Sequence, residues 1–293
     1  MNAPYYLGCP IWASDDWRGR LFTASARRQD WLRQYSQVFN TVEGNSVFYG
    51  LPTTETAARW CEQTAEGFRF CLKFPRAISH DQDLLTARRD TEAFLEILRI
   101  LHEGERLGPS FLQLSPAFGA ARLPELKAYL KSLPPEFPYA VEVRHPDFHP
   151  RQEGDRELTK ILRKRQVERV ILDSRPLFSA PAETPDETRA RGRKPRLPVR
   201  FETLGQQPFL RLIGRDNADQ AQPWLEQWAP VIAGWIAEGR TPYVFAHSPN
   251  DAFAPDLARR FHQELRKHSA QLEPEAPWLG ETSTGGQQLE LFS

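Results

Sequence analysis

YAVEVR, residues Tyr139–Arg144, is a short apolar run that ends in charged side chains. Strands that are buried on both faces of a parallel sheet have this appearance, because neither face needs polar residues. Seven further runs of similar length occur along the chain, and amphipathic stretches such as Glu92–His102 and Trp224–Ala237 separate them. The seven runs are Tyr5–Cys9, Thr41–Val47, Phe68–Lys73, Ser110–Leu114, Arg169–Asp173, Phe209–Ile213 and Tyr243–Ala246.

The alternation of strands and helices predicts parallel βαβ units. Eight such units within roughly 260 residues predict a (β/α)8 TIM-type barrel of the α/β class, in preference to a six-stranded doubly wound sheet. We expect residues 1–267 to form this barrel as a single domain, with a polar, Pro- and Arg-rich insertion at about 175–205. Residues 268–293 are expected to be a flexible, disordered tail, since about 271–286 holds Pro, Gly, Ser and Thr without a sustained apolar period.

The composition argues against several classes of protein. The 293 residues carry 38 Lys and Arg against 38 Asp and Glu, so no net field draws the chain to nucleic acid or to a membrane, and such binding would need a local patch. No apolar run approaches the ~20 residues of a membrane span, and the first residues lack the features of a signal peptide. Three cysteines are too few for a disulfide framework. We therefore expect a soluble, cytoplasmic protein.

Polar side chains at the ends of the predicted strands form the candidate site. In a barrel the carboxyl ends of the strands meet on one face, so side chains far apart in sequence converge there. Reading each strand with a period of two gives the candidate catalytic residues Glu43, Lys73, Glu142 and Asp173 and the candidate substrate-binding residues Asn45, Gln113, Arg144, His145, Arg211 and His247, with Trp12 and Tyr49 just beyond the first two strands.

These residue types indicate acid–base chemistry on an anionic substrate, such as a hydrolase or a lyase carries out. Arg144 and Arg211 are expected to hold a phosphate or a carboxylate, since planar guanidinium groups suit both. Glu142 or Glu43 would be the general base, with Lys73 as an acid or an electrophilic helper. The alternative is a self-compensating network of ion pairs that closes the top of the barrel without any chemistry.

No cofactor is predicted, and a divalent metal is the less favoured alternative. The side chains that could bind one are Glu43, Glu142, His145, Asp173 and His247. No His-x-His, His-Glu-x-x-His or Cys cluster fixes a metal by local spacing, and neighbouring arginines would oppose a divalent cation. The chain also shows no Gly-rich phosphate loop and no dinucleotide-binding fingerprint.

Several segments, in their order along the chain, resemble the YecE-like family, also called domain of unknown function 72. They are Cys9–Trp12, Phe39–Tyr49, Phe68–Pro75, Gln113–Pro116, Val141–Pro146 and Arg211–Arg215. The resemblance covers roughly residues 5–267 and implies a TIM barrel, but it implies no activity. The chain departs from the family in strand seven, where Ile213 stands in place of a frequent histidine. A mechanism that used that histidine would need His247 in its place.

The predicted insertion contains a basic stretch, Arg189–Arg200, with six positive charges in twelve residues. Such a run is either a solvated loop or a contact to a phosphate backbone, since a loop after strand six emerges on the catalytic face of a barrel. The candidate nucleic-acid contacts are Arg191, Arg193, Lys194 and Arg196.

The last residues resemble the pentapeptide with which bacterial polymerases and repair proteins dock on the replicative sliding clamp. Its specified positions are matched by Gln288, Leu289, Leu291 and Phe292. An apolar end on a polar tether needs something to cover it. A bacterial DNA polymerase sliding clamp is therefore the expected partner, and the alternative is that the tail folds back onto the protein itself.

Together these features favour a protein that binds or processes a phosphate-bearing substrate, such as a nucleic-acid end or a damaged nucleotide, and that its clamp peptide brings to DNA replication or repair. Two alternatives stay open. One is a metabolic enzyme that acts on a small anionic substrate such as a sugar phosphate. The other is a non-catalytic adaptor whose pocket charges are structural.

Overall fold

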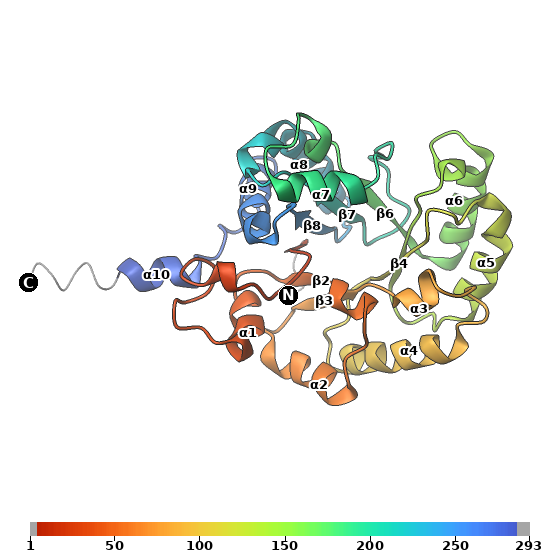
Figure 1. The fold of residues 1–293 in the computed structure, drawn as a ribbon, viewed down its shortest axis with the longest axis horizontal. Coiled ribbons are helices and arrows are strands. Elements are labelled where there is room, and N and C mark those ends of the chain that lie inside the picture. Colours follow the sequence, from red (N-terminus) through yellow and green to blue (C-terminus); the bar gives the residue numbers. More distant parts are fainter. Residues whose placement is uncertain (1–4, 286–293) are drawn as a thin grey trace, which may run out of the picture.

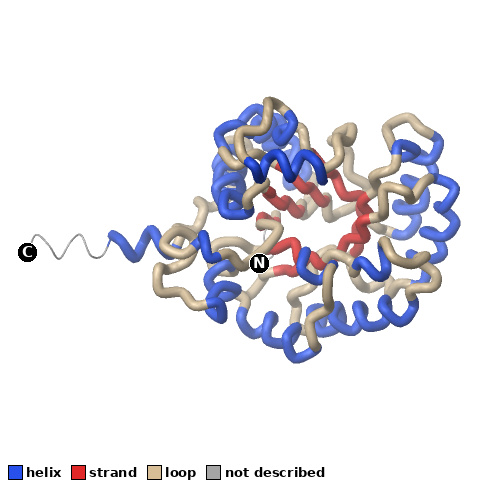
Figure 2. The backbone as a smooth tube through the Cα atoms, viewed as in Figure 1, coloured by secondary structure: helices blue, strands red, loops and turns tan. Residues whose placement is uncertain are grey.

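The structure, a computed structural model, describes residues 5–285, and describes side chains as far as residue 282. Within this range eight strands lie at the centre of the molecule, with helices around them (Figures 1 and 2). All of their pairings are parallel. The strands are β1 (Tyr6–Gly8), β2 (Thr41–Gly44), β3 (Arg69–Leu72), β4 (Ser110–Gln113), β5 (Tyr139–Glu142), β6 (Glu168–Asp173), β7 (Phe209–Ile213) and β8 (Tyr243–His247). Each of the eight predicted runs contains one of them.

Helices follow the strands along the chain, and most of them lie around the sheets (Figure 2). They are α1 (Trp31–Tyr35), α2 (Thr54–Gln63), α3 (Arg76–Ser79), α4 (Arg88–Glu103), α5 (Leu123–Ser132), α6 (Glu153–Arg165), α7 (Pro185–Arg193), α8 (Gln222–Ala237), α9 (Ala254–Arg266) and α10 (Leu279–Gly285). In α4 the buried side chains Phe94, Leu98 and Leu101 recur at helical spacing, so one face covers the sheet while the other meets water. Among the described residues, no helix is long and apolar enough to cross a membrane.

The expected closed, eight-stranded TIM-type barrel is wrong. Six strands form one open, curled parallel sheet, a half-barrel in the order β1-β8-β7-β6-β5-β4, and β2 and β3 form a separate two-stranded sheet. Between β3 and β4 the described residues keep isolated bridges, from Phe70 to Leu107 and from Lys73 to Phe111, in place of a ladder. The fold is therefore mixed α/β with a half-barrel sheet.

Between β1 and β2 a backbone hydrogen bond from the Glu43 N–H to the Cys9 carbonyl, at 3.0 Å, is supplemented by side chains. The Tyr35 hydroxyl accepts a hydrogen bond from the Cys9 N–H at 2.7 Å and donates one to the Thr41 carbonyl at 3.0 Å. The Asn40 amide likewise bonds to the backbone of the first strand. Such groups satisfy the backbone polar atoms of two strands without extending the ladder. The two strands are therefore connected without a continuous ladder, and they belong to different sheets.

The inside of the curl is filled by aromatic rings. Phe209 packs against Phe111, with ring centroids 5.3 Å apart, and against Phe245 at 4.9 Å. Tyr6 stacks on Tyr243 at 4.5 Å. These rings belong to an inner apolar cluster that every strand except β2 supplies, and the cluster forms the floor beneath the polar ends of the strands.

The insertion predicted at 175–205 contains a helix, α7, that the sequence pattern did not reveal. Thr184 caps its first turn by accepting a hydrogen bond from the Glu187 N–H at 3.1 Å. Glu187 is the one buried residue of this helix, and its carboxylate accepts a hydrogen bond from Arg215 at 2.7 Å. Without an apolar period the helix gives no amphipathic signal. The Glu187–Arg215 pair holds α7 near the carboxyl ends of the strands.

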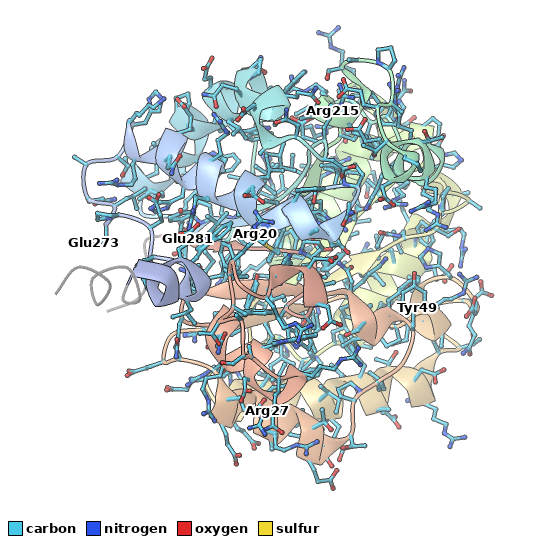
Figure 3. The ribbon with its side chains drawn as sticks, turned by 60° about the vertical axis from the view of Figure 1, so that its left-hand side comes forward. Arg20, Arg27, Tyr49, Arg215, Glu273 and Glu281 are labelled. Atoms are coloured by element: carbon cyan, nitrogen blue, oxygen red, sulfur yellow. The ribbon has the colours of Figure 1, made fainter. Side chains whose placement is uncertain are left out.

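The described part of the predicted tail packs on the rest of the domain. Trp278 is 3% exposed, and its ring lies 5.5 Å from the Arg20 guanidinium and 3.6 Å from that of Arg259. Gly280 approaches the chain so closely that a Cβ there would lie 2.4 Å from a backbone atom of Gly19. Figure 3 shows α10 beside this segment. The peptide Gln288–Phe292 lies outside the described residues.

Candidate functional site

The candidate site is built from residues at the carboxyl ends of the strands. Parallel neighbours place these ends at one edge of the sheet, and the register sets Gln113 beside Glu142 and Ile213 beside His247. The period-two pattern then decides which side chains turn inward, above the aromatic floor. The guanidinium of Arg211, for example, lies 5.1 Å from the Phe111 ring.

Arg211 joins the two central carboxylates. Its Nε and Nη2 donate to the two oxygens of Glu43 at 2.8 and 2.7 Å, and its Nη1 donates to Glu142 Oε2. The three side chains are between 0 and 3% exposed. A buried charge is tolerated when it is paired and hydrogen-bonded, as all three are here. The guanidinium occupies the place that a cation bridging the two carboxylates would take.

A second set of polar groups surrounds this triad. Arg144 donates from Nε to Glu142 Oε1 and from Nη2 to Gln113 Oε1, both at 2.8 Å. On the other side, Asn45 donates to Glu43 Oε1 at 2.7 Å, and His247 Nε2 lies 3.1 Å from Glu43 Oε2. Five of these seven side chains lie in five different strands, so the network locks the strand ends together.

The network shifts the proton affinities of its members. Burial by itself raises the pKa of Glu142, but Arg211 and Arg144 outweigh it and lower that pKa to about 2. The pKa of Glu43 is held well below its usual value in the same way, by Arg211 and His247 against burial. Burial lowers the pKa of His247 to about 4, so this ring is neutral at neutral pH. Carboxylates held this firmly as anions are weak proton acceptors, which disfavours the base role predicted for either glutamate.

Lys73 differs from the other charged groups of the site. It is 9% exposed, and its Nζ lies 3.8 Å from the centroid of the Phe48 ring. Among the described residues this amine makes no ion pair and no hydrogen bond. Burial and the nearby Arg211 lower its pKa to about 8, although Glu142 and Glu43 act in the opposite direction.

A cavity of about 480 Å³ opens above these groups. It is lined by six cationic side chains, two carboxylates and several neutral groups, and part of the lining comes from α7 and the residue after it. The cations are Lys73, Arg144, Arg189, Arg193, Lys194 and Arg211, and the carboxylates are Asp186 and Asp251. Positive charge is therefore in excess on the walls.

Most of the predicted binding residues meet at this cavity. Asn45, Tyr49, Gln113, Arg144, Arg211 and His247 line it, and so do Lys73, Arg193 and Lys194. Tyr49 is 85% exposed at its rim (Figure 3), with its ring edge-on to Phe48 at 5.1 Å. Ile213 lines the cavity next to His247.

Other predicted residues lie elsewhere. The Asp173 carboxylate accepts hydrogen bonds from Arg175 and from Trp228 Nε1 of α8, so it faces the helical layer. The Trp12 ring packs edge-on against Trp60 at 5.1 Å, within the core. Arg191 and Arg196 lie against the ring of Phe178 at 5.4 and 4.3 Å and do not line the cavity.

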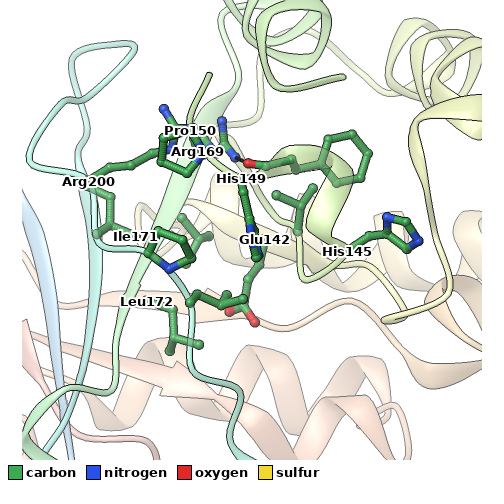
Figure 4. Close-up of a pocket in the computed structure, with 13 residues that line it drawn as sticks. Glu142, His145, His149, Pro150, Arg169, Ile171, Leu172 and Arg200 are labelled. Atoms are coloured by element: carbon green, nitrogen blue, oxygen red, sulfur yellow. Dashed lines mark hydrogen bonds between the residues drawn. The ribbon is translucent and has the colours of Figure 1, made fainter. Parts of the chain in front are cut away.

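His145 belongs to a second, smaller cavity of about 40 Å³, which lies between β5, β6 and the segment that includes Arg200 (Figure 4). Glu142 lies at one end of it, and Arg169 and Arg200 lie at the other. Its volume is about that of one or two water molecules, so it is too small for a substrate. Among residues 5–282, no group of three His, Cys, Asp or Glu side chains is arranged to hold a metal ion.

Sequence reasoning missed Asp251, which follows the eighth strand and lines the cavity. Burial raises its pKa to about 6, with Lys194 acting against the shift and Glu43 adding to it. Its place four residues beyond the end of β8 was the available signal, since loops that follow strands surround the site. Sequence reasoning also placed Lys194 on a nucleic-acid surface, whereas its side chain reaches the cavity, where burial lowers its pKa to about 8.

Comparison with known proteins gives consistent matches. The family model described as "Protein of unknown function DUF72" matches residues 6–281. The UPF0759 protein YecE of Escherichia coli K12 is 38% identical over 288 residues, which cover 98% of this chain and 99% of that protein, and its counterpart in E. coli O157:H7 matches to the same extent. Among solved structures, a DUF72 family protein (EF0366) of Enterococcus faecalis V583 aligns with a TM-score of 0.66 at 17% identity, covering 92% of this chain and 97% of that one. A DUF72 family protein (TM1631) of Thermotoga maritima MSB8 aligns with a TM-score of 0.64 at 19% identity, covering 89% and 99%. These structures share the fold.

Proposed function

Since the chain belongs to the DUF72 family of proteins of unknown function, whose description gives no ligand, we propose from the site itself that the cavity binds a phosphate-bearing anion. The observation that carries the proposal is the excess of positive charge on the cavity wall. Of its cations, Lys73, Arg193 and Lys194 form no ion pair within the described residues. Unpaired positive charges that share a confined space repel one another, and an anion relieves this repulsion.

The kind of anion follows from the donors. Guanidinium forks and lysine amines are the side chains that bind phosphate oxygens most often, and Arg193, Lys194 and Lys73 present both types. A volume of about 480 Å³ lies within the range of small-ligand sites. The exposed Tyr49 at the rim offers a flat face to a sugar or a base. The ligand is therefore a small phosphate ester or the terminal phosphate of a nucleic acid.

Thermal unfolding tests this proposal. Pyrophosphate, ribose 5-phosphate and a 5′-phosphorylated oligonucleotide are added in turn to the purified protein, and a true ligand raises Tm by roughly 2–6 °C at saturation. Arg193→Gln should remove most of this shift. Arg99→Gln, an exposed position on α4, is the matched control and should keep it. Equal shifts with sodium sulfate and with every phosphate ester would reduce the site to a general anion site and refute a specific phosphate ligand.

A second proposal concerns the partner. We propose that Gln288–Phe292 tethers the protein to a replicative sliding clamp, which is supported by the match of the peptide to the clamp-binding pattern. The test is binding of the intact protein to a purified bacterial clamp. Phe292→Ala should abolish micromolar binding, whereas Glu290→Ala, at the unspecified position of the peptide, should keep it. Binding that survives Phe292→Ala would exclude the tether.

A further inference from the structure

We propose that Lys73 is a nucleophile that forms an imine with the carbonyl group of a phosphate-bearing aldehyde or ketone. The inference rests on the proposed function, because the cations of the cavity wall hold the phosphate while the amine reacts. Its basis is the placement of Lys73, whose side chain lines the cavity from the end of β3 but has no ionic or hydrogen-bonding partner among the described residues.

Burial without an ion pair is unusual for a lysine. The chain has seven lysines; Lys160 and Lys267, for example, are exposed and paired with a glutamate three residues away, whereas Lys73 and Lys194 line the cavity without an ion pair among the described residues. The two carboxylates nearest to the site centre, Glu43 and Glu142, are already bound by arginines. Lys73 therefore makes no direct ion pair with a buried acid, and its amine contacts the Phe48 ring instead.

The surroundings of the amine keep part of it uncharged. The ring of Phe48 lies against Nζ on one side, and Arg211 and Arg144 add positive charge nearby. Desolvation and neighbouring cations are the two means by which imine-forming lysines are activated. With a pKa of about 8, roughly a tenth of the amine is unprotonated at neutral pH, against far less than a hundredth for an ordinary lysine.

The same cavity supplies a group for the proton transfers. The Asp251 carboxyl lines it and accepts no hydrogen bond among the described residues, and its pKa of about 6 lets it gain and lose a proton near neutrality. In the reaction the uncharged amine nitrogen attacks the carbonyl carbon and gives up its two protons, the carbonyl oxygen takes up two protons and leaves as water, and a C=N bond replaces the C=O bond. The protonated imine withdraws electrons from the neighbouring carbon, which a lyase requires.

Lys194 is the competing lysine, since it also lines the cavity without an ion pair. It lies in the loop after α7, whereas the backbone of Lys73 is held between two sheets by its bridge to Phe111 and its hydrogen bond to the Gly44 carbonyl. The backbone of Lys194 has one such contact, to the Ala190 carbonyl of its own helix, and sites built on strand ends are more precise than sites on loops. The geometry therefore favours Lys73.

Reductive trapping tests the inference. The full-length protein is incubated with glycolaldehyde phosphate and sodium cyanoborohydride, which reduces an imine to a stable secondary amine, and the adduct is located by peptide mass mapping. One adduct on Lys73 is expected. Lys73→Arg keeps the charge but cannot form an imine, and should lose at least about tenfold of the labelling. Lys131→Arg, an exposed position on α5, is the matched control and should label normally. Labelling that maps to Lys194, or that persists in Lys73→Arg, would overturn the proposal.

Two further arms separate this inference from the proposed function. If phosphate esters stabilise both the wild-type protein and Lys73→Arg while Lys73 takes up no adduct, the nucleophile is refuted and phosphate binding stands. If phosphate-free glycolaldehyde labels Lys73 as well as the phosphorylated form does, the nucleophile stands and phosphate recognition fails. An oligonucleotide with one abasic site carries the same aldehyde and phosphate chemistry. Stronger trapping of it than of glycolaldehyde phosphate identifies nucleic acid as the source, and the reverse identifies a metabolite.

Discussion

Arg211 and Glu43 form a two-point ion pair between strands that belong to different sheets. Nε and Nη2 of Arg211 lie 2.8 and 2.7 Å from the two oxygens of Glu43, and both side chains are almost completely buried. The pair therefore connects the half-barrel to the two-stranded sheet at the point where the backbone ladder is interrupted.

We expect Arg211→Met to lower the free energy of unfolding by about 3–5 kcal/mol, because the change leaves Glu43 and Glu142 buried without their main counter-ion. Urea unfolding at pH 7 measures the loss. Arg99→Met, on the exposed side of α4, is the control and should change stability by less than about 0.5 kcal/mol. A loss below about 1 kcal/mol for Arg211→Met would show that the triad is not what holds the two sheets together.

The lowered pKa of Glu142 makes the free energy of unfolding fall as the pH is lowered. Its pKa is about 2 in the folded protein and about 4.3 in an unfolded chain, so the unfolded state takes up a proton first as the pH falls. The contribution, about 3 kcal/mol, is complete above about pH 5 and disappears between pH 5 and 2. Unfolding titrations of Glu142→Gln should show a shallower decline over this range than those of the wild type. Parallel curves for the two proteins would contradict the shift.

Lys73 is expected to reduce stability. Its pKa is about 8 in the folded protein and about 10.5 when unfolded, so the unfolded state holds the proton more tightly and stability rises with pH between 8 and 10.5. Lys73→Met should stabilise the protein at pH 7 by about 1–3 kcal/mol and remove this rise. Lys131→Met should do neither. A destabilised Lys73→Met protein would mean that the contact of the amine with the Phe48 ring outweighs the cost of burying the charge, and would contradict the lowered pKa.

The Glu187–Arg215 pair should control the position of α7. Glu187→Gln weakens the carboxylate contact that holds the helix, so amide hydrogens of residues 185–193 should exchange faster, and phosphate-dependent stabilisation should fall with them. Thr188→Ala, on the exposed side of the same helix, is the control and should leave both unchanged. Faster exchange with unaltered phosphate binding would show that α7 does not shape the site.

The strands were predictable from the sequence, and their closure was not. Runs such as Phe209–Ile213 coincide with the observed strand because both of its faces are buried, which makes the whole run apolar. The connection between β1 and β2 depends on where the Tyr35 hydroxyl and the Asn40 amide insert. These are contacts between separate segments, and a local pattern carries no information on them.

In the site, too, some features were predictable from the sequence and others were not. The period-two pattern predicts that Glu43, Glu142 and Arg211 face one another, as they do in the structure. The inward direction that it predicts for Asp173 is wrong. In β6 the inward position is taken by Val170, which belongs to the inner cluster, so Asp173 shares the outward face with Arg169. A period of two fixes which residues share a face but not which of the two faces turns inward. Lys194 reaches the cavity because α7 lies beside it. The buried anchor of this helix is a charged residue, so the sequence shows no apolar period that would predict the helix.

Because Trp278 is packed on the domain, only a short stretch of chain connects the domain to the clamp-binding peptide. Gly285 ends α10, and only two residues separate it from Gln288, so even a fully extended chain spans roughly 10 Å between them. If the peptide docks, this short connection keeps the domain close to the clamp. It thereby raises the local concentration of the domain at the DNA that the clamp encircles. The tail would then set the distance between the domain and the clamp as well as attach one to the other.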